Sequence, residues 1–374
     1  MNEPNPTDPI LSTNPQTPTD GAILGGEAGK QQRLRSPNYR NYRFCRRFAH
    51  PACPILMSHD NRYFYEIDNR NVRRIDIQTG ELIHELPPVK ETMWIGESTA
   101  TETNTVYPTH LALSHDGCLL AVAHTDMTAS LWRIDSSKPE ALLVTFEKRH
   151  PDAQFHSNLS AIAFAANDEY LFAVSNGYLS YEDTALWMLK PLDTISRTRG
   201  RISGYMPHPF YGTTGMIAAS ADGSVLVGKQ SDSSIEVAQF VCSSKQKRDT
   251  ISPIFPDSSN IRCLAVSPDN QWLAVGSENA LRLGHIETLN LREPISIASV
   301  NRLVFAPDSQ TLIGGGRDGR IEFWDVPSGE TCGSLPRSED PVSSLVSSRD
   351  GTILLVYSKP KDEMGFIEVW ELAK

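Results

Sequence analysis

The sequence of 374 residues has no run that approaches the roughly 18 consecutive apolar residues of a membrane-spanning helix, so we do not expect it to cross a bilayer or to bind a membrane. Its N-terminus has neither the basic start nor the apolar stretch of a secretory signal, which predicts a cytoplasmic protein. The six cysteines lie far apart without a Cys-x-x-Cys pair. We therefore expect free, buried thiols rather than a zinc knuckle or a redox dithiol.

Motifs of catalysis and cofactor binding are also missing. The sequence has no Gly-x-Ser-x-Gly elbow, no helical pair of histidines with metal-ligand spacing and no phosphate-binding glycine loop that leads into a helix. Its ten histidines fall in separate turns, strands and loops, so they suggest no convergent set. We predict no catalytic residue, no metal site and no cofactor.

Positive charge is scarce overall but concentrated in one segment. The net charge of −10 argues against a protein whose whole surface binds nucleic acid or an anionic membrane. Seven cations without an acid lie in residues 30–48, namely Lys30, Arg33, Arg35, Arg40, Arg43, Arg46 and Arg47, and residues 49–374 carry −13. This basic arm, Lys30 to Arg47, could bind an acidic partner or nucleic acid, or it could simply lead into the fold.

The N-terminal segment differs in composition from the rest. Residues 1–40 are rich in Pro, Asn, Thr and Gly and lack a periodic apolar pattern, so they cannot bury enough surface to offset the entropy of ordering. We predict a disordered tail over residues 1–40, which ends in basic residues, and a folded domain over residues 41–374.

A short phrase recurs seven times in the folded part, each time after an apolar stretch. It consists of a small residue, any residue, Asp or Asn, and Gly, Asn, Ser or another polar residue. The copies are Ser58-His59-Asp60-Asn61, Ser114-His115-Asp116-Gly117, Ala165-Ala166-Asn167-Asp168, Ser220-Ala221-Asp222-Gly223, Ser267-Pro268-Asp269-Asn270, Ala306-Pro307-Asp308-Ser309 and Ser348-Arg349-Asp350-Gly351. Their average spacing is roughly 48 residues, in the range of one propeller blade. Because the Asp side chain bonds the following backbone and Gly or Asn tolerates positive φ, each copy predicts a hairpin turn.

The sixth repeat shows the unit most clearly. Strands are predicted at residues 300–305, 311–316, 321–326 and 331–335, separated by three turns. This pattern predicts one antiparallel blade of four strands.

These repeats resemble the WD-repeat β-propeller family. The resemblance rests on Trp324-Asp325 and on tryptophans at the same place in other repeats, Trp132, Trp187 and Trp370. The repeats are degenerate, because the third strands of repeats one, four and five carry Ile75-Asp76, Ala238-Gln239 and Gly284-His285 there, and the Gly-His pair that usually precedes the first strand is missing. The family's buried network of His, Asp, Ser/Thr and Trp is therefore expected to be incomplete. The short, turn-rich sequences of the repeats look like those of bacterial proteins.

The chain ends suggest how the ring closes. The last repeat stops after its third strand, residues 367–372, while residues 41–48 read as an outer strand without a hairpin partner. We expect an all-β, seven-bladed β-propeller of four-stranded antiparallel blades, closed by this N-terminal strand pairing with the last blade beside Trp370. Six or eight blades remain possible if a weak repeat is misassigned.

The resemblance implies a non-catalytic scaffold that binds a protein or peptide partner. We expect the docking face to carry the inter-blade loops, three of which are long, at residues 88–108, from residue 148 and at 197–212. Cations interleaved with aromatics suit recognition, so the predicted partner-binding residues are Trp94, Arg197, Arg199, Arg201, Tyr205, Phe210 and Tyr211. Tyr178, Tyr181, Glu182 and Asp183 would lie nearby. Alternatively, the long loop packs its aromatics inward over a blade edge.

Two other functions remain open. The first is a propeller enzyme, such as a lactonase-like hydrolase with a channel-bound cation, which needs acidic and amide side chains on the first strands. Those strands are almost wholly apolar, as in residues 111–113 and 303–305, which disfavours it. The second is nucleic-acid binding through the basic arm, with an affinity that falls steeply with salt.

Overall fold

The computed structural model describes a set of ranges that covers most of the repeats. The ranges are residues 41–49, 54–68, 70–87, 107–125, 128–134, 141–146, 159–165, 167–175, 184–189, 216–231, 234–242, 245–252, 254, 260–297, 300–336, 340–361 and 363–373. The chain divides into the units Met1–Arg35 and Ser36–Lys374, and every described residue belongs to the second. None of the described residues forms a helix long and apolar enough to span a membrane.

The described strands form seven antiparallel sheets, which we number along the chain from β2. Sheet one contains β2 (Ile55–Met57), β3 (Tyr63–Asp68), β4 (Asn71–Asp76) and β5 (Leu82–Leu86). Sheet two contains β6 (Pro108–Leu113), β7 (Leu119–His124), β8 (Ala129–Arg133) and β9 (Ala141–Phe146). Sheet three contains β10 (Leu159–Ala165), β11 (Tyr170–Ser175) and β12 (Thr184–Met188). Sheet four contains β13 (Ile217–Ala219), β14 (Val225–Ser231), β15 (Ser234–Cys242) and β16 (Lys245–Ile251).

The remaining three sheets contain the last repeats and the N-terminal strand. Sheet five contains β17 (Cys263–Val266), β18 (Trp272–Gly276) and β19 (Ala280–His285), and both β20 (Asn290–Leu291) and β21 (Ile295–Ser296) pair with β19. Sheet six contains β22 (Arg302–Phe305), β23 (Thr311–Gly315), β24 (Ile321–Asp325) and β25 (Thr331–Leu335). Sheet seven contains β26 (Val342–Ser347), β27 (Ile353–Ser358), β28 (Phe366–Leu372) and β1 (Tyr42–Ala49), which pairs with β28 so that Phe44 lies opposite Trp370.

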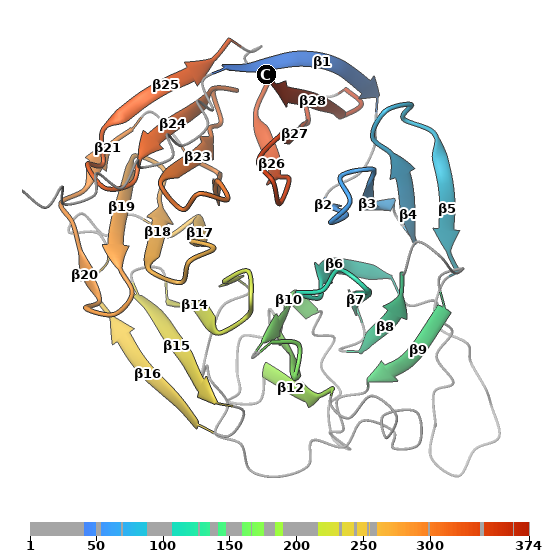
Figure 1. Ribbon diagram of the computed structural model, residues 1–374, viewed down its shortest axis with the longest axis horizontal. Helices are drawn as coiled ribbons and strands as arrows, with labels where there is room; N and C mark the ends of the chain where they lie inside the picture. The colour runs from blue at the N-terminus through green and yellow to red at the C-terminus, as the bar shows by residue number, and fades with distance from the viewer. Residues whose placement is uncertain are drawn as a thin grey trace, which may run out of the picture. The chain divides into compact units, whose positions relative to one another are not determined.

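The sheets follow one another around a ring (Figure 1). The first strands contact each other in the cyclic order β2, β6, β10, β13, β17, β22, β26 and back to β2. This arrangement confirms the predicted all-β propeller.

The seven repeated phrases all lie between the first and second strands of a sheet, and Ala166 of the third copy is outside the described residues. In each of the turns with Asp at the third position, the carboxylate accepts a backbone N–H two residues later, as in Cys118 N to Asp116 Oδ1 at 2.9 Å. The serine hydroxyl adds a contact that sequence reasoning did not predict, because Ser114 Oγ donates to Asp116 and accepts from Leu119 N. The fourth residue of every phrase has positive φ, as predicted for this turn: Asn61, Gly117, Asp168, Gly223, Asn270, Ser309 and Gly351.

The hydrophobic core is divided among the junctions between sheets. Seven clusters of buried residues are present, and each joins two consecutive sheets. At the junction of sheets seven and one, Leu355 and Val369 pack with Ile55 and Phe64. Second strands such as β7 and β27 are buried along their whole length, because a neighbouring sheet covers each of their faces.

The tryptophans of the third strands do not share one hydrogen-bond pattern. Trp132 Nε1 donates to Ser130 Oγ at 2.9 Å, and His124 Nε2 lies 2.8 Å from the same hydroxyl. Trp324 is fully buried, and its Nε1 has no hydrogen-bond partner among the described residues. The family's network is therefore incomplete at Trp324, in sheet six, as the sequence predicts.

The cysteines differ from the prediction of buried thiols. The four described ones are all free, but only Cys263 is buried, whereas Cys45 and Cys118 are exposed. The prediction is wrong for these two because Cys45 lies at a register shift in the outer strand β1 and Cys118 follows a surface turn. Cys53 and Cys242 lie outside the residues whose side chains are described.

Candidate functional site

The two faces of the propeller carry different connections. In an antiparallel sheet, the first-to-second and third-to-fourth strand turns lie at one end, which we name the turn face. The second-to-third strand turns and the connections between sheets lie at the other end, which we name the loop face. The predicted docking surface belongs to the loop face.

The predicted partner-binding residues lie outside the described residues. This applies to Trp94, Arg197, Arg199, Arg201, Tyr205, Phe210 and Tyr211, and also to Tyr178, Tyr181, Glu182 and Asp183. Their role stays a prediction. Among the turns between second and third strands on this face, those of sheets five and six are described without a gap.

Four arginines and one glutamate lie in neighbouring connections on the loop face of sheets five and six. Arg262 precedes β17, Glu278 lies in the turn between β18 and β19, and Arg302 begins β22. Arg317 and Arg320 lie in the turn between β23 and β24. We name these five residues the arginine corner; sequence reasoning missed it because its members come from four separate connections.

Glu278 links the two sheets within the arginine corner. Its Oε2 lies 2.8 Å from Arg262 Nη2 of its own sheet, and its Oε1 lies 3.0 Å from Arg317 Nη1 of sheet six. The hydrogen bond and charge of Arg262, followed by those of Arg317, hold the pKa of this carboxyl below its usual value. Glu278 is therefore a carboxylate at neutral pH, and it bridges cations from neighbouring sheets.

Arg302 begins the first strand β22 at the same end, and its charge acts on groups of sheets two and five. Burial, with a smaller contribution from the charge of Arg302, lowers the pKa of His110 in β6 to about 4. Burial raises the pKa of the Cys263 thiol to about 12, although the charge of Arg302 opposes this. At neutral pH His110 is thus uncharged and Cys263 is a protonated thiol. Cys263 is therefore not the thiolate that a nucleophilic cysteine needs.

On the turn face, side chains from different sheets meet near the axis. Arg349 Nη1 of sheet seven lies 3.2 Å from His59 Nδ1 of sheet one and donates to the His115 carbonyl of sheet two at 3.0 Å. His115 N in turn donates to the Asp168 carboxylate of sheet three at 2.8 Å. The sequence did not predict that the turns of His59 and His115 come close, because the two residues belong to different hairpins.

The hydrogen-bond partners fix the tautomers of both histidines. His59 Nδ1 faces a guanidinium, which can only donate, so this nitrogen must be the acceptor. His115 Nδ1 lies 2.8 Å from the Ala221 carbonyl and must be the donor. Burial is the main cause that lowers the pKa of His59, and the charges of Arg349 and His115 add to it. These contacts hold the turns together and leave His59 neutral.

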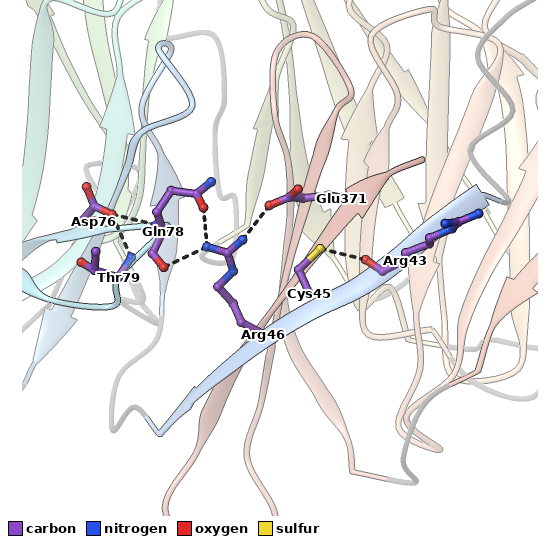
Figure 2. A network of polar contacts seen from close by, with 7 residues as sticks. All are labelled: Arg43, Cys45, Arg46, Asp76, Gln78, Thr79 and Glu371. Atoms are coloured by element: carbon purple, nitrogen blue, oxygen red, sulfur yellow. Dashed lines mark hydrogen bonds and ion pairs between the residues drawn. The ribbon is translucent and has the colours of Figure 1, made fainter. Parts of the chain in front are cut away.

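The N-terminal strand β1 joins sheet seven to sheet one through Arg46 (Figure 2). Arg46 Nη2 pairs with Glu371 Oε1 of β28 at 2.9 Å, while Nη1 donates to the Gln78 carbonyl at 2.8 Å. Gln78 lies in the turn between β4 and β5, where the carboxylate of Asp76 accepts the backbone N–H groups of Gln78 and Thr79. Arg46 thus connects the last sheet to an ordered turn of the first.

Other residues of β1 make contacts within sheet seven and with both neighbouring sheets. Arg47 pairs with the buried Glu368 of β28 at 2.5 Å. Phe48 lies over Gly80 and leaves no room there for a side chain. Tyr42 stacks on Phe323 of sheet six with ring centroids 6.3 Å apart. Two of the seven cations of the basic arm therefore neutralise acids of the same chain, which weakens the hypothesis that the whole arm binds nucleic acid.

Candidate metal ligands do not gather in the described part of the chain. No group of three or more His, Cys, Asp or Glu with metal-binding geometry occurs among the described residues. The repeated aspartates, such as Asp116 and Asp222, are engaged in their own turns.

Comparison with known proteins places two of the repeats in a family. The family model "WD domain, G-beta repeat" matches residues 251–283 and 294–325, which fall in sheets five and six apart from the end of β16. The Periodic tryptophan protein 2 homolog of Dictyostelium discoideum is 27% identical over 121 residues, which are 31% of this chain and 13% of that protein.

Other relatives match over similar lengths. An uncharacterized WD repeat-containing protein of Synechocystis is 28% identical over 102 residues, 25% of this chain and 28% of that protein. Protein RAE1 of Arabidopsis thaliana is 30% identical over 102 residues, 25% of this chain and 29% of that protein. The matches thus span less than a third of each of these relatives. They come from eukaryotes and a cyanobacterium, so the bacterial style of the repeats is not supported.

The matched repeats contain Trp324-Asp325, the dipeptide on which the resemblance was based. The other tryptophans of the motif lie in equivalent third strands, Trp132 in β8, Trp187 in β12 and Trp370 in β28. With the ring of antiparallel sheets, these matches show that the chain contains WD repeats, and they support its resemblance to the WD-repeat β-propeller family.

Proposed function

We propose that this protein is a non-catalytic scaffold that binds a protein or peptide partner on its loop face. The observation that carries the proposal is the arginine corner, where side chains from sheets five and six meet at the exposed Glu278. A relative whose name places it in a complex is consistent with it, since Target of rapamycin complex subunit wat1 of Schizosaccharomyces pombe is 28% identical over 106 residues, 26% of this chain and 32% of that protein.

We also infer that the ring has seven blades and that β1 closes it. Seven sheets and seven inter-sheet core clusters support the count. The ladder between β1 and β28 and the contacts of Arg46 support the closure. An experimental structure with six or eight blades would contradict this inference.

Site-specific photo-crosslinking in the native host tests the docking face. A photoreactive residue replaces Asn279 on the loop face or, as a matched control in the same sheet, Glu287 on the turn face; both positions are exposed. We expect a defined crosslinked protein from position 279 and none from position 287. Crosslinks only from position 287, or from neither position, would contradict the proposed face.

The predicted loop residues are tested separately. An Arg197/Arg199/Arg201→Ala variant is compared with the intact chain for the proteins it recovers from the host. We expect the variant to lose the partner, because guanidinium groups provide directional contacts to carboxylates. Recovery of the same proteins by both chains would remove these three residues from the site.

A propeller enzyme, the alternative to a scaffold, is tested by a separate measurement. A lactonase-like hydrolase would retain a bound cation at one per chain, so metal analysis of the purified protein addresses it directly. We expect no stoichiometric metal. A stoichiometric cation would replace the scaffold proposal with the enzyme.

A further inference from the structure

The arginine corner already holds one carboxylate. Glu278 accepts a hydrogen bond from Arg262 at 2.8 Å and from Arg317 at 3.0 Å, so each oxygen faces a guanidinium from a different sheet. The spacing of the two arginines therefore fits a carboxylate. Nearly half of the Glu278 side chain is exposed, as is more than half of that of Arg317. A second carboxylate can reach this place from solvent.

The arginine corner has more cations than acids. Within the described part of the chain, two carboxylates pair with these arginines: Glu278, and the partly exposed Asp318, which lies 3.5 Å from Arg320. Glu322 in β24 is partly buried, and burial and the charge of Asp318 raise its pKa. Arg302 is exposed, and its one recorded hydrogen bond among the described residues goes to the Asn301 carbonyl at 2.8 Å. Its charge is thus not compensated by an acid within the described part of the chain.

This surplus stands out against the rest of the domain. Residues 49–374 carry a charge of −13. A cationic site on an acidic body attracts an acidic ligand locally while the remaining surface repels it, which favours one orientation of binding. Arginine is suited to this role, because its planar guanidinium can donate two parallel hydrogen bonds to a carboxylate.

We propose that the arginine corner binds an acidic peptide segment of the partner, whose carboxylates pair with Arg302 and compete with Glu278 for Arg262 and Arg317. The proposal rests on the proposed function, since it gives the chemistry of the partner on the same face. Glu278 then acts as an internal competitor: it keeps the two arginines ordered, and it lowers the affinity for the ligand.

The competition gives substitutions of opposite sign. The probe is a fluorescein-labelled octaglutamate peptide, and its binding is followed by fluorescence anisotropy at 50 mM and 300 mM salt. Arg302→Gln should weaken binding by about two- to fivefold, and Arg302→Gln with Arg317→Gln by about tenfold. Glu278→Gln should tighten binding by about two- to fivefold, because it removes the carboxylate that competes for Arg262 and Arg317. Binding should weaken at the higher salt.

Arg133→Gln is the matched control. Arg133 is an exposed arginine at the end of β8, where the chain enters the turn face. It should leave the affinity unchanged within twofold, although it removes the same charge from the molecule. Thermal unfolding of each variant shows whether the fold is retained, and Glu278→Gln provides a gain of affinity that misfolding cannot produce.

Three results would overturn the proposal. They are no binding of octaglutamate to the wild type at 50 mM salt, weaker binding after Glu278→Gln, and equal loss of affinity in the Arg133 control. A single-stranded DNA oligonucleotide serves as competitor; tighter binding of the DNA with the same loss in the Arg302 variants would replace the peptide by nucleic acid. Crosslinking from position 279 together with a failed octaglutamate assay would refute the acidic chemistry alone and leave the docking face intact.

Discussion

Gly314 and Trp324 provide a direct test of how sheet six is packed. A Cβ at Gly314 would lie 2.6 Å from Cζ3 and 2.9 Å from Cη2 of Trp324. Gly314→Ala should therefore push the indole from its position, which costs about 1–3 kcal/mol as overpacking. The backbone of Gly314 lies outside the positive-φ region, so alanine recovers about 0.4–1 kcal/mol through the unfolded chain. We expect a net loss of roughly 1–2 kcal/mol of unfolding free energy.

Trp324→Phe removes the clashing atoms and the unpaired indole N–H together. The cavity left by the smaller ring destabilises the fold, whereas removal of a buried donor without a partner stabilises it by about 1–3 kcal/mol. We expect this variant to lie close to the wild type. In its background Gly314→Ala should no longer clash, so the double variant should be more stable than the two single changes predict by about 1–3 kcal/mol.

Urea unfolding of the four proteins, followed by far-UV circular dichroism, measures this coupling. Gly315→Ala serves as control, because its Cβ would lie 2.5 Å from Cγ1 of Val342 instead of meeting Trp324. It should be destabilising in both backgrounds by the same amount. A coupling between Gly314 and Trp324 below about 0.5 kcal/mol would refute the close packing of the indole on Gly314, since distant sites are additive within that margin.

Three further changes test other junctions by urea unfolding. The pKa of His59 is lowered in the folded protein, so the stability that the neutral His59 contributes is complete above the unfolded pKa of 6.5 and is lost as pH falls below it. His59→Gln should therefore reduce the loss of unfolding free energy between pH 7.5 and 5.5, and an unchanged pH profile would contradict this. Arg46→Gln should cost about 1–2 kcal/mol, while Arg43→Gln on the same strand should stay within about 0.5 kcal/mol; equal effects would argue against the contact with Gln78. Gly223→Ala should cost about 2–4 kcal/mol, because Gly223 has a φ of 66° and its Cβ would lie 2.8 Å from backbone of sheet three; a cost below 1 kcal/mol would contradict that packing.

The fold was predictable because its determinants are local and repeated. The turn chemistry of Asp116 and its equivalents acts within five residues, and the predicted strand at residues 331–335 matches β25. The predicted strand at residues 300–305 begins two residues early, since Val300 is buried in the core before the ladder starts at Arg302. Local patterns thus predict which segments are strands. They do not fix the strand ends, because a residue can be buried there without taking part in the ladder of hydrogen bonds.

The candidate sites depend on distances that no local pattern contains. Arg349 meets His59 across 290 positions of the sequence, and this meeting depends on the radius of the ring and on the tilt of the turns. The arginine corner similarly needs the turn at Glu278 to lie beside the turn at Arg317 of the next sheet. The sequence therefore revealed clusters of cations only where the cations lie close together along the chain, as in the basic arm.

The pairing of β1 with β28 has a consequence during synthesis on the ribosome. Tyr42 lies opposite Leu372, so β1 leaves the exit tunnel well before its partner strand and has to wait for it. At about 5–20 residues per second this delay is on the order of 15–70 s. During that time the register shift at Cys45 and the charges of Arg43, Arg46 and Arg47 would hinder pairing with strands of other nascent chains.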